Sequence, residues 1–137
     1  MALYHFTDAR NIDSIKQYGL LSWVQLLQRN IDHFPGSNRL SRKLDVQHNL
    51  QNYVRLCLRP YHPMAHIAII EGRIKNIVWL EIGYGVTHWR TTLFSDDNAT
   101  SNNATVNNES TTAFDSVSNQ AEVLIHGSLN SKWITFP

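Results

Sequence analysis

The chain has 137 residues with 12 Lys and Arg against 11 Asp and Glu, so its net charge of +1 indicates no particular class of partner. An apolar content of 42% excludes a disordered chain, and the length predicts one domain, residues 1–137, around one core. The sequence has no apolar run of membrane-helix length and no signal-peptide pattern at its N-terminus. We therefore expect a cytoplasmic protein without membrane contact, and a monomer.

The N-terminal part of the chain predicts a strand, two helices and a loop. Asn11 or Asp8 can accept hydrogen bonds from the open N–H groups of a first helical turn, and Gly19 can take the left-handed conformation that ends a helix. Residues 33–49 are polar and basic and contain Pro and Gly, which is typical of a surface loop with room for one helical turn. The expected elements are a strand at 3–7, helices at 11–18 and 23–28, and a loop at 33–49.

The rest of the chain predicts more strands than helices. Pro63 in a first turn and Gly72 after the last turn frame one helix. The nearly continuous apolar run at 77–82 is typical of a buried strand. Because strands and helices mix without strict alternation, we expect an α+β fold rather than a doubly wound parallel sheet. Strands are expected at 53–58, 77–82, 93–94, 121–126 and 132–136, with a turn at 127–130.

One segment stands apart by composition. Residues 95–119 are almost entirely Ser, Thr, Asn, Asp and Ala. Such a segment cannot bury enough apolar surface to belong to a core. We therefore expect a long, mobile polar loop at 95–119.

Charge is distributed unevenly along the chain. Residues 39–59 are basic, whereas residues 95–122 carry five carboxylates and no Lys or Arg. The basic segment can contact phosphates, but a cluster of this size is also usual on a solvated surface, so charge alone leaves both interpretations open. Its basic residues are Arg39, Arg42, Lys43, Arg55 and Arg59, against the single carboxylate of Asp45.

Glu122 interrupts a strand that is otherwise apolar. Because Ala121 and Val123 face opposite to Glu122, the carboxylate can simply point to solvent. The functional hypothesis is a carboxylate that binds a ribose hydroxyl and stabilises the positive charge that forms as a glycosidic bond breaks. The residue spacing leaves both hypotheses open.

The His residues offer two further candidates. His5 lies near Thr7 and Asn11, and together they present several groups that can bind a ribose, although a lone His in a strand is usually structural. His62 and His66 are four residues apart, but zinc needs three or four ligands, so we expect no metal site. The single Cys is expected in the core. No GxGxxG, P-loop or GxSxG motif occurs.

Several short motifs follow one another along the chain in a particular order. Together they resemble the DarT family of DNA ADP-ribosyltransferases over nearly the whole chain. The chain differs from that family before Gln120, where relatives usually carry a helical segment and an Arg, and where this chain has a shorter polar stretch. The motifs are Tyr4-His5-Phe6-Thr7, Asn11, Gly19-Leu20, Ser41-Arg42-Lys43-Leu44-Asp45, Tyr53-Val54-Arg55-Leu56, His62-Pro63-Met64, Leu93-Phe94-Ser95-Asp96-Asp97-Asn98-Ala99-Thr100 and Gln120-Ala121-Glu122.

The resemblance implies an ADP-ribosyltransferase-like split β-sheet around an NAD cleft, with a few flanking helices. NAD is then consumed as a substrate, and no metal is needed. The active-site Arg is expected in a loop over the pocket, where Arg42 is preferred to Arg39. The implied residues are Glu122 and Arg42 for catalysis, and His5, Thr7, Asn11, Tyr53 and Met64 for binding NAD.

The same resemblance implies an acceptor base in single-stranded DNA, which an enzyme can reach without unstacking a duplex. Arg39, Lys43 and Arg55 are then expected to contact the nucleic acid. The family supplies toxins paired with a macrodomain antitoxin, so a toxin or phage-defence role is expected. The alternatives are an ADP-ribosyltransferase that modifies RNA or protein, and an inactive module that binds NAD or nucleic acid.

Overall fold

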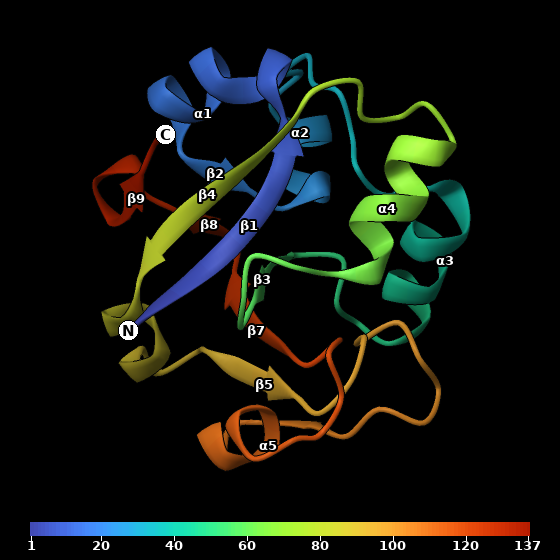
Figure 1. Cartoon of the computed structure of the whole chain (residues 1–137), viewed down its shortest axis with the longest axis vertical. Coiled ribbons are helices and arrows are strands. Elements are labelled where there is room, and N and C mark those ends of the chain that lie inside the picture. The colour runs from blue at the N-terminus through green and yellow to red at the C-terminus, as the bar shows by residue number, and fades with distance from the viewer.

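The computed structural model describes all 137 residues, which form a large and a small sheet flanked by short helices (Figure 1). The large sheet contains β1 (Ala2–Asp8), β3 (Tyr53–Cys57), β4 (Ile77–Gly83), β5 (Leu93–Ser95), β6 (Val106–Asn107), β7 (Glu122–His126) and β9 (Ile134–Thr135), in the order β6-β5-β7-β3-β1-β4-β9. The small sheet pairs β2 (Leu20–Leu21) with β8 (Ser128–Leu129). All strand pairs are antiparallel. The expected α+β class is therefore confirmed.

The helices are short and lie around the sheets. In Figure 1, α1 and α2 lie at one end of the molecule and α5 at the other. No helix combines the length and the apolar character that are needed to cross a bilayer. The α-helices are α1 (Ile12–Tyr18), α2 (Trp23–Gln28), α3 (Arg39–Gln47), α4 (Pro63–Ile70) and α5 (Ser110–Phe114), and the 3-10 turns are η1 (Ala9–Asn11), η2 (Tyr84–His88) and η3 (Ser131–Trp133).

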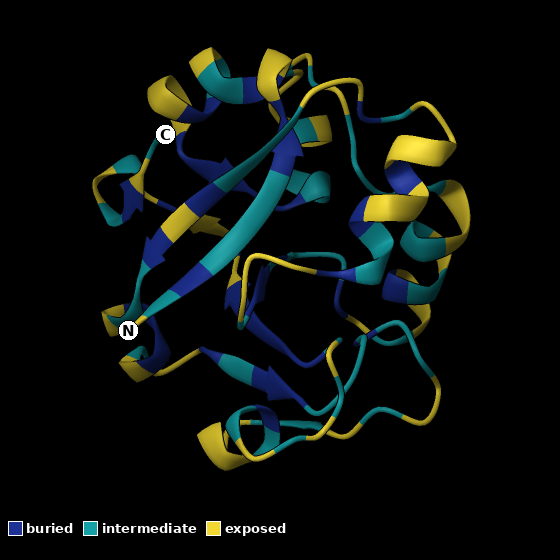
Figure 2. Cartoon of the chain, in the orientation of Figure 1, coloured by how far each residue is buried: buried dark blue, intermediate teal, exposed yellow.

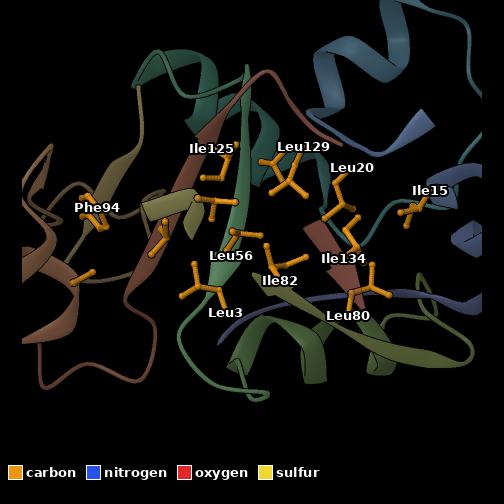
Figure 3. Packing of buried hydrophobic residues seen from close by; sticks show 14 of the residues in the cluster. Leu3, Ile15, Leu20, Leu56, Leu80, Ile82, Phe94, Ile125, Leu129 and Ile134 are labelled. Atoms are coloured by element: carbon orange, nitrogen blue, oxygen red, sulfur yellow. The ribbon is translucent and has the colours of Figure 1, made fainter. Parts of the chain in front are cut away.

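The core forms where the two sheets and α1 meet (Figure 3). Leu3 on β1, Leu56 on β3 and Leu80 on β4 are fully buried, and Ile15 on α1 packs against the same cluster. On β4 the alternation of a strand is visible, because Leu80 is buried while its neighbour Glu81 is exposed (Figure 2). The core therefore joins the central strands into one body that can hold a site.

The large sheet opens between β1 and β3. The pairing of β1 with β4 runs through seven residue pairs, whereas β1 meets β3 only at Tyr4 and Cys57. Beyond that pair the two strands diverge, and the His5 ring reaches across to the carbonyl of Arg55, with 2.8 Å between its Nδ1 and the oxygen. At the opening, the His5 side chain thus forms the contact between β1 and β3 that backbone hydrogen bonds form elsewhere in the sheet. This is the split that was expected from the sequence.

The region expected as a loop at 33–49 contains the nine-residue helix α3, so that prediction was wrong. Asn38 caps the helix, since its Oδ1 accepts a hydrogen bond from the Ser41 N–H at 2.8 Å. Asp45 is the only buried residue of α3. Leu40 and Leu44 are four residues apart, but the polar and basic composition of the segment outweighed this short helical spacing.

The prediction for 95–119 was also wrong in part. The segment contains the end of β5, β6 and α5, and Ala99 and Ala113 are buried. Short polar side chains hold it together: Asp96 accepts from the Thr105 N–H at 2.8 Å, and Asn107 accepts from the Thr112 hydroxyl at 2.7 Å. The buried methyl groups of Ala99 and Ala113, together with these local hydrogen bonds, give residues 95–119 a defined structure, although their composition predicts a loop.

The strand expected at 132–136 is shorter than predicted, because Lys132 and Trp133 belong to the 3-10 turn η3 and Ile134–Thr135 alone forms strand β9. Asn130 caps η3 by accepting the Lys132 N–H at 2.9 Å, and only Ile134–Thr135 pairs with β4. The Trp133 ring packs on Gly83 and Gly85, where a Cβ on Gly85 would lie 3.0 Å from the ring. The apolar character of this segment therefore serves both the packing of Trp133 on the two glycines and the short pairing of β9 with β4.

Asp8, not Asn11, caps the chain after β1, and it is fully buried. Its carboxylate accepts hydrogen bonds from the N–H of Arg10 and from the N–H of Lys75, each at 2.8 Å, and pairs with the Arg10 guanidinium at 2.9 Å. The hydrogen bonds from Arg10 hold the pKa of Asp8 well below its usual range. Asp8 therefore ties the end of β1 to the segment before β4.

Replacing Asp8 with Ala is expected to lower the free energy of unfolding by about 2 kcal/mol, since two backbone N–H groups lose their acceptor. Urea unfolding of the variant measures the loss. Asp32→Ala, at an exposed carboxylate, is the matched control and should change stability by less than about 0.5 kcal/mol. Equal stability of the two variants would contradict this role of Asp8.

Candidate active site

A cleft lies at the opening between β1 and β3, and most of the residues singled out from the sequence line it. The cleft is lined from β1, η1, α1, β2, α2, the 33–37 segment, α3, β3, the start of α4, the turn at Asn98 and β7. Arg39 and Lys43 do not line it. The expected residues in the cleft are His5, Thr7, Asn11, Arg42, Tyr53, Arg55, Met64 and Glu122.

Glu122 is the first residue of β7 and is only 4% exposed, so the solvent-facing hypothesis was wrong. β7 is covered on both edges, with Cys57 of β3 on one side of Glu122 and Ser95 of β5 on the other. Its Oε1 accepts the N–H of Ala99 at 2.8 Å. No hydrogen bond occupies Oε2, which leaves that oxygen available in the cleft. A buried carboxylate with one free oxygen is suited to bind a hydroxyl group.

Arg55 connects Glu122 to a second buried carboxylate. Its Nη1 lies 3.5 Å from Glu122 Oε1, and its Nη2 pairs with Asp45 on α3. Nη1 also donates to Asn98 Oδ1 at 3.2 Å. Burial raises the pKa of Asp45, and the Arg55 charge opposes that rise. Arg55 was grouped with Arg39 and Lys43 from the sequence, but its surroundings are those of a cleft residue.

Arg42 also faces the cleft, from a helix rather than from the expected loop. Its Nε donates to Ser37 Oγ at 3.1 Å, and its guanidinium carbon lies 5.7 Å from the centre of the Trp23 ring. Its Nη2 is buried and has no hydrogen-bond partner. Burial lowers the pKa of Arg42. A half-buried cation with an unused donor is suited to bind an electron-rich group.

His5 offers an acceptor to the cleft. Since its Nδ1 is bonded to a carbonyl oxygen, that nitrogen carries the proton and donates, and Nε2 is left with a free lone pair. Burial lowers the pKa of His5, and the hydrogen bond to the Arg55 carbonyl partly opposes this. The ring is therefore neutral near pH 7. In this state it can accept a hydrogen bond from a ribose hydroxyl.

Asn11 lines the cleft, and its side chain also holds the neighbouring residues in place. Its Nδ2 donates to Thr7 Oγ1 at 3.0 Å and to the Phe34 carbonyl at 2.8 Å, while its Oδ1 accepts the Phe34 N–H at 2.8 Å. These bonds hold the 33–36 segment against the end of β1. Thr7 and Phe34 consequently have defined positions at the cleft wall.

A comparison with family models decides the affiliation of the chain. The matching model is described as "ssDNA thymidine ADP-ribosyltransferase, DarT" and covers residues 4–135. The chain belongs to the DarT family. No curated protein sequence matches the chain.

Solved DarT structures are similar to this fold. DarTG from Thermosipho africanus in complex with ADP-ribose has a TM-score of 0.78 and 19% identity over 98% of this chain, which spans 42% of the length of that protein. DarT from Thermus sp. 2.9 in complex with carba-NAD+ has a TM-score of 0.67 and 18% identity, with 97% of this chain and 79% of that chain covered. The same Thermus protein in complex with ADP-ribosylated ssDNA has a TM-score of 0.65 and 18% identity, with 97% and 78% covered.

In this DarT fold, Arg39 and Lys43 lie on the exposed side of α3. Neither forms an ion pair or a hydrogen bond with another side chain, in contrast to Arg55. The three residues expected to contact nucleic acid thus divide into two that are open to solvent and one inside the cleft. The structure brings together no group of His, Cys, Asp and Glu that could hold a metal ion.

Four cleft residues had no assigned role in the sequence analysis. Asp45 and Asn98 lie within the motifs of the DarT resemblance, but nothing in their spacing predicts that both bond to Arg55. Trp23 Nε1 donates to Asp45 Oδ2 at 3.2 Å, a contact between α2 and α3 that is visible only in the fold. His62 was considered only as a metal ligand, although its place before a Pro is a usual signal for a helix cap.

His62 caps α4 and is 2% exposed. Its Nδ1 accepts the Met64 N–H at 3.1 Å, while its Nε2 is buried without a hydrogen-bond partner. Burial lowers the pKa of His62 from its ordinary value of 6.5, and the nearby charge of Glu122 opposes this. The folded protein therefore resists protonation of this ring at mildly acidic pH.

The lower pKa of His62 in the folded protein than in the unfolded chain predicts a pH dependence of stability. In the unfolded chain His62 binds a proton below about pH 6.5, whereas the folded protein keeps the ring neutral, so acidification destabilises the fold. Lowering the pH from about 7.5 to about 5.5 should therefore reduce the melting temperature by a few degrees more in the wild type than in His62→Asn. Asn retains a capping oxygen. The groups that face His62, namely Glu122, Arg55 and Asp97, are common to both proteins, and equal losses would exclude His62 as the cause.

Proposed function

We propose that this chain is an enzyme that transfers ADP-ribose from NAD to thymine bases of single-stranded DNA, and that the single domain 1–137 carries this activity as a monomer in the cytoplasm. The observation that carries the proposal is the carboxylate of Glu122, buried in a cleft with one oxygen unoccupied. Membership of the DarT family, whose model is described as a thymidine-modifying enzyme, supports the same reaction.

NAD is a substrate of this reaction, and the cleft fits its chemistry. The His5 Nε2 lone pair and the Thr7 hydroxyl lie on the β1 wall and can bind ribose hydroxyls, while Asn11 holds Thr7 in place. Tyr53 and Met64 line the same cleft from β3 and α4 and offer apolar contact to the nicotinamide ring. A structure of Thermus DarT with carba-NAD+, an NAD analogue, has a similar fold.

The reaction exchanges one bond to the ribose carbon for another. The bond from ribose to nicotinamide breaks, a bond forms to a ring nitrogen of thymine, and the proton of that nitrogen is lost. Positive charge develops on the ribose at this point, and the Glu122 carboxylate, bound to a ribose hydroxyl through Oε2, stabilises it. Arg42 lines the same cleft, and its guanidinium can orient the base and stabilise negative charge on it.

The acceptor strand is expected to approach over α3. Arg39 and Lys43 are exposed there and can contact phosphates. A single strand presents its bases without unstacking. The fold is similar to that of DarTG from Thermosipho africanus. On this ground we propose a toxin or phage-defence role, with a macrodomain antitoxin that reverses the modification.

Incubation of the purified chain with labelled NAD tests the proposal directly. Separate reactions should contain single-stranded DNA rich in thymine, DNA without thymine, RNA, and a protein mixture. Label is expected only on the DNA that contains thymine. Label on RNA or protein would favour the other ADP-ribosyltransferase hypotheses, and NAD binding without transfer to any acceptor would favour an inactive binding module.

A further inference from the structure

The Asp45–Arg55–Glu122 arrangement has a feature that the transfer reaction does not itself require. Two buried carboxylates, on α3 and β7, converge on one guanidinium from β3. The side chains of Asp45 and Glu122 are 7% and 5% exposed, and that of Arg55 is 22% exposed. Two like charges in such surroundings repel each other strongly unless a cation lies between them. Arg55 is that cation.

The sheet register fixes the direction in which Arg55 reaches. Cys57 is directly opposite Glu122 in the pairing of β3 with β7, and Arg55 is opposite Leu124. Residues two apart on a strand share a face, so Arg55 lies diagonally beside Glu122 on the same face of the sheet. Its guanidinium approaches Glu122 at Oε1, with 3.5 Å between Nη1 and that oxygen.

The other contacts of Arg55 hold it in this orientation. Nη2 pairs with Asp45, and Asp45 is itself fixed by the Trp23 N–H. Nη1 donates to Asn98, which begins the turn whose Ala99 N–H binds Glu122 Oε1. The planar fork of an Arg can serve these acceptors together, whereas the single ammonium of a Lys cannot. One oxygen of Glu122 is thus fixed from two sides.

We propose that Arg55 is a positioning residue, which holds the Glu122 carboxylate charged and turned so that Oε2 faces the NAD ribose, and that Asp45 acts through Arg55. The inference rests on the proposed function and deepens it. It differs from the expectation that Arg55 contacts DNA phosphates, because the guanidinium is already engaged by two protein carboxylates. In this role the guanidinium acts on the catalytic carboxylate and not on the acceptor strand.

Arg55→Met removes the charge and keeps an apolar stem, and Arg55→Lys keeps the charge without the fork. For Arg55→Met we expect kcat to fall about tenfold, which corresponds to about 1.4 kcal/mol. The acid limb of the kcat against pH profile should move to higher pH, since Glu122 loses its nearest cation. Arg55→Lys should restore part of both effects. The dependence of DNA binding on salt should be the same as in the wild type.

The other groups around Glu122 stay in place in these variants. The titratable or charged groups that face it are Asp45 from α3, Cys57 from β3 and His62 at the start of α4, with Asp97 near His62. Arg90→Met, at an exposed Arg after η2, is the matched control and should leave the pH profile unchanged. In a double variant, Asp45→Asn should add little to Arg55→Met, because its effect passes through Arg55.

A measurement without turnover separates this inference from the proposed function. The pH titration of the Glu122 side-chain carboxyl carbon, followed by NMR in the wild type and in Arg55→Met, should show a higher midpoint in the variant. An unchanged midpoint in a folded Arg55→Met variant would overturn the positioning role. If the salt dependence of DNA binding becomes weaker while the acid limb of the pH profile stays unchanged, Arg55 contacts DNA phosphates instead. If the wild type transfers no label while the Glu122 midpoint still differs between the wild type and Arg55→Met, only the proposed function is rejected.

Discussion

Glu122→Gln is expected to lower the rate of ADP-ribosyl transfer on the order of 10³-fold, as removal of a key electrostatic group in other enzymes does. The change replaces one oxygen with an amide nitrogen and removes the negative charge. An amide oxygen can still accept the Ala99 N–H that now binds Oε1, so the local structure is retained. What is lost is the charge that stabilises the ribose as nicotinamide leaves.

The measurement is initial transfer of label from NAD to single-stranded DNA at saturating concentrations of both substrates. Glu81→Gln is the matched control, since Glu81 is an exposed carboxylate on β4, and it should transfer at the wild-type rate. Both variants should melt cooperatively. A Glu122→Gln protein that is folded and retains more than about a tenth of the wild-type rate would remove Glu122 from the chemical step.

The strands that build the cleft were predictable because their apolar residues outweigh all other signals. The runs around Leu3, Leu56 and Leu80 each predict a strand, and each supplies a fully buried side chain. The opening between β1 and β3 was expected only from the family resemblance. No local pattern indicates that Tyr4 and Cys57 are the last residues to pair before the strands diverge.

The elements that were missed share a physical cause. α3 buries only Asp45, and α5 buries only Ala113. The sequence signal for a helix is therefore weak in both, with only Leu40 and Leu44 at helical spacing in α3 and none in the short α5. Both depend instead on caps and on contacts with distant segments. Such contacts form only after the chain has folded, and a sequence read alone does not contain their partners.

The site residues show the same limit. The position of Glu122 in an apolar strand marked it as unusual, but spacing could not tell a buried carboxylate from an exposed one. Glu122 is buried because β3 and β5 flank β7 and cover both of its edges. Arg55 was read as a phosphate contact because it follows other basic residues, whereas its partners Asp45 and Glu122 are 10 and 67 residues away along the chain.

Arg42→Ala is expected to reduce transfer about 10²-fold, while Arg39→Ala should retain most of the activity. The sequence favoured Arg42 without excluding Arg39, and in the fold Arg42 lines the cleft whereas Arg39 does not. Arg42 lines the cleft and stacks near Trp23 with its Nη2 unpartnered, whereas Arg39 is exposed at the start of α3. A cation in the cleft can stabilise charge in the transition state, and a solvated cation on the rim contributes mainly to encounter with DNA.

The two variants should differ in kind as well as in size. Arg42→Ala should lower kcat with little change in DNA affinity, and Arg42→Lys should recover only part of the loss because a Lys cannot form the planar fork. Arg39→Ala should weaken DNA binding and reduce the slope of log affinity against log salt by roughly 0.7, the value for one contact to a single strand. Full activity in Arg42→Ala together with loss in Arg39→Ala would mean that the exposed Arg39, and not the cleft residue, turns toward the base when DNA binds.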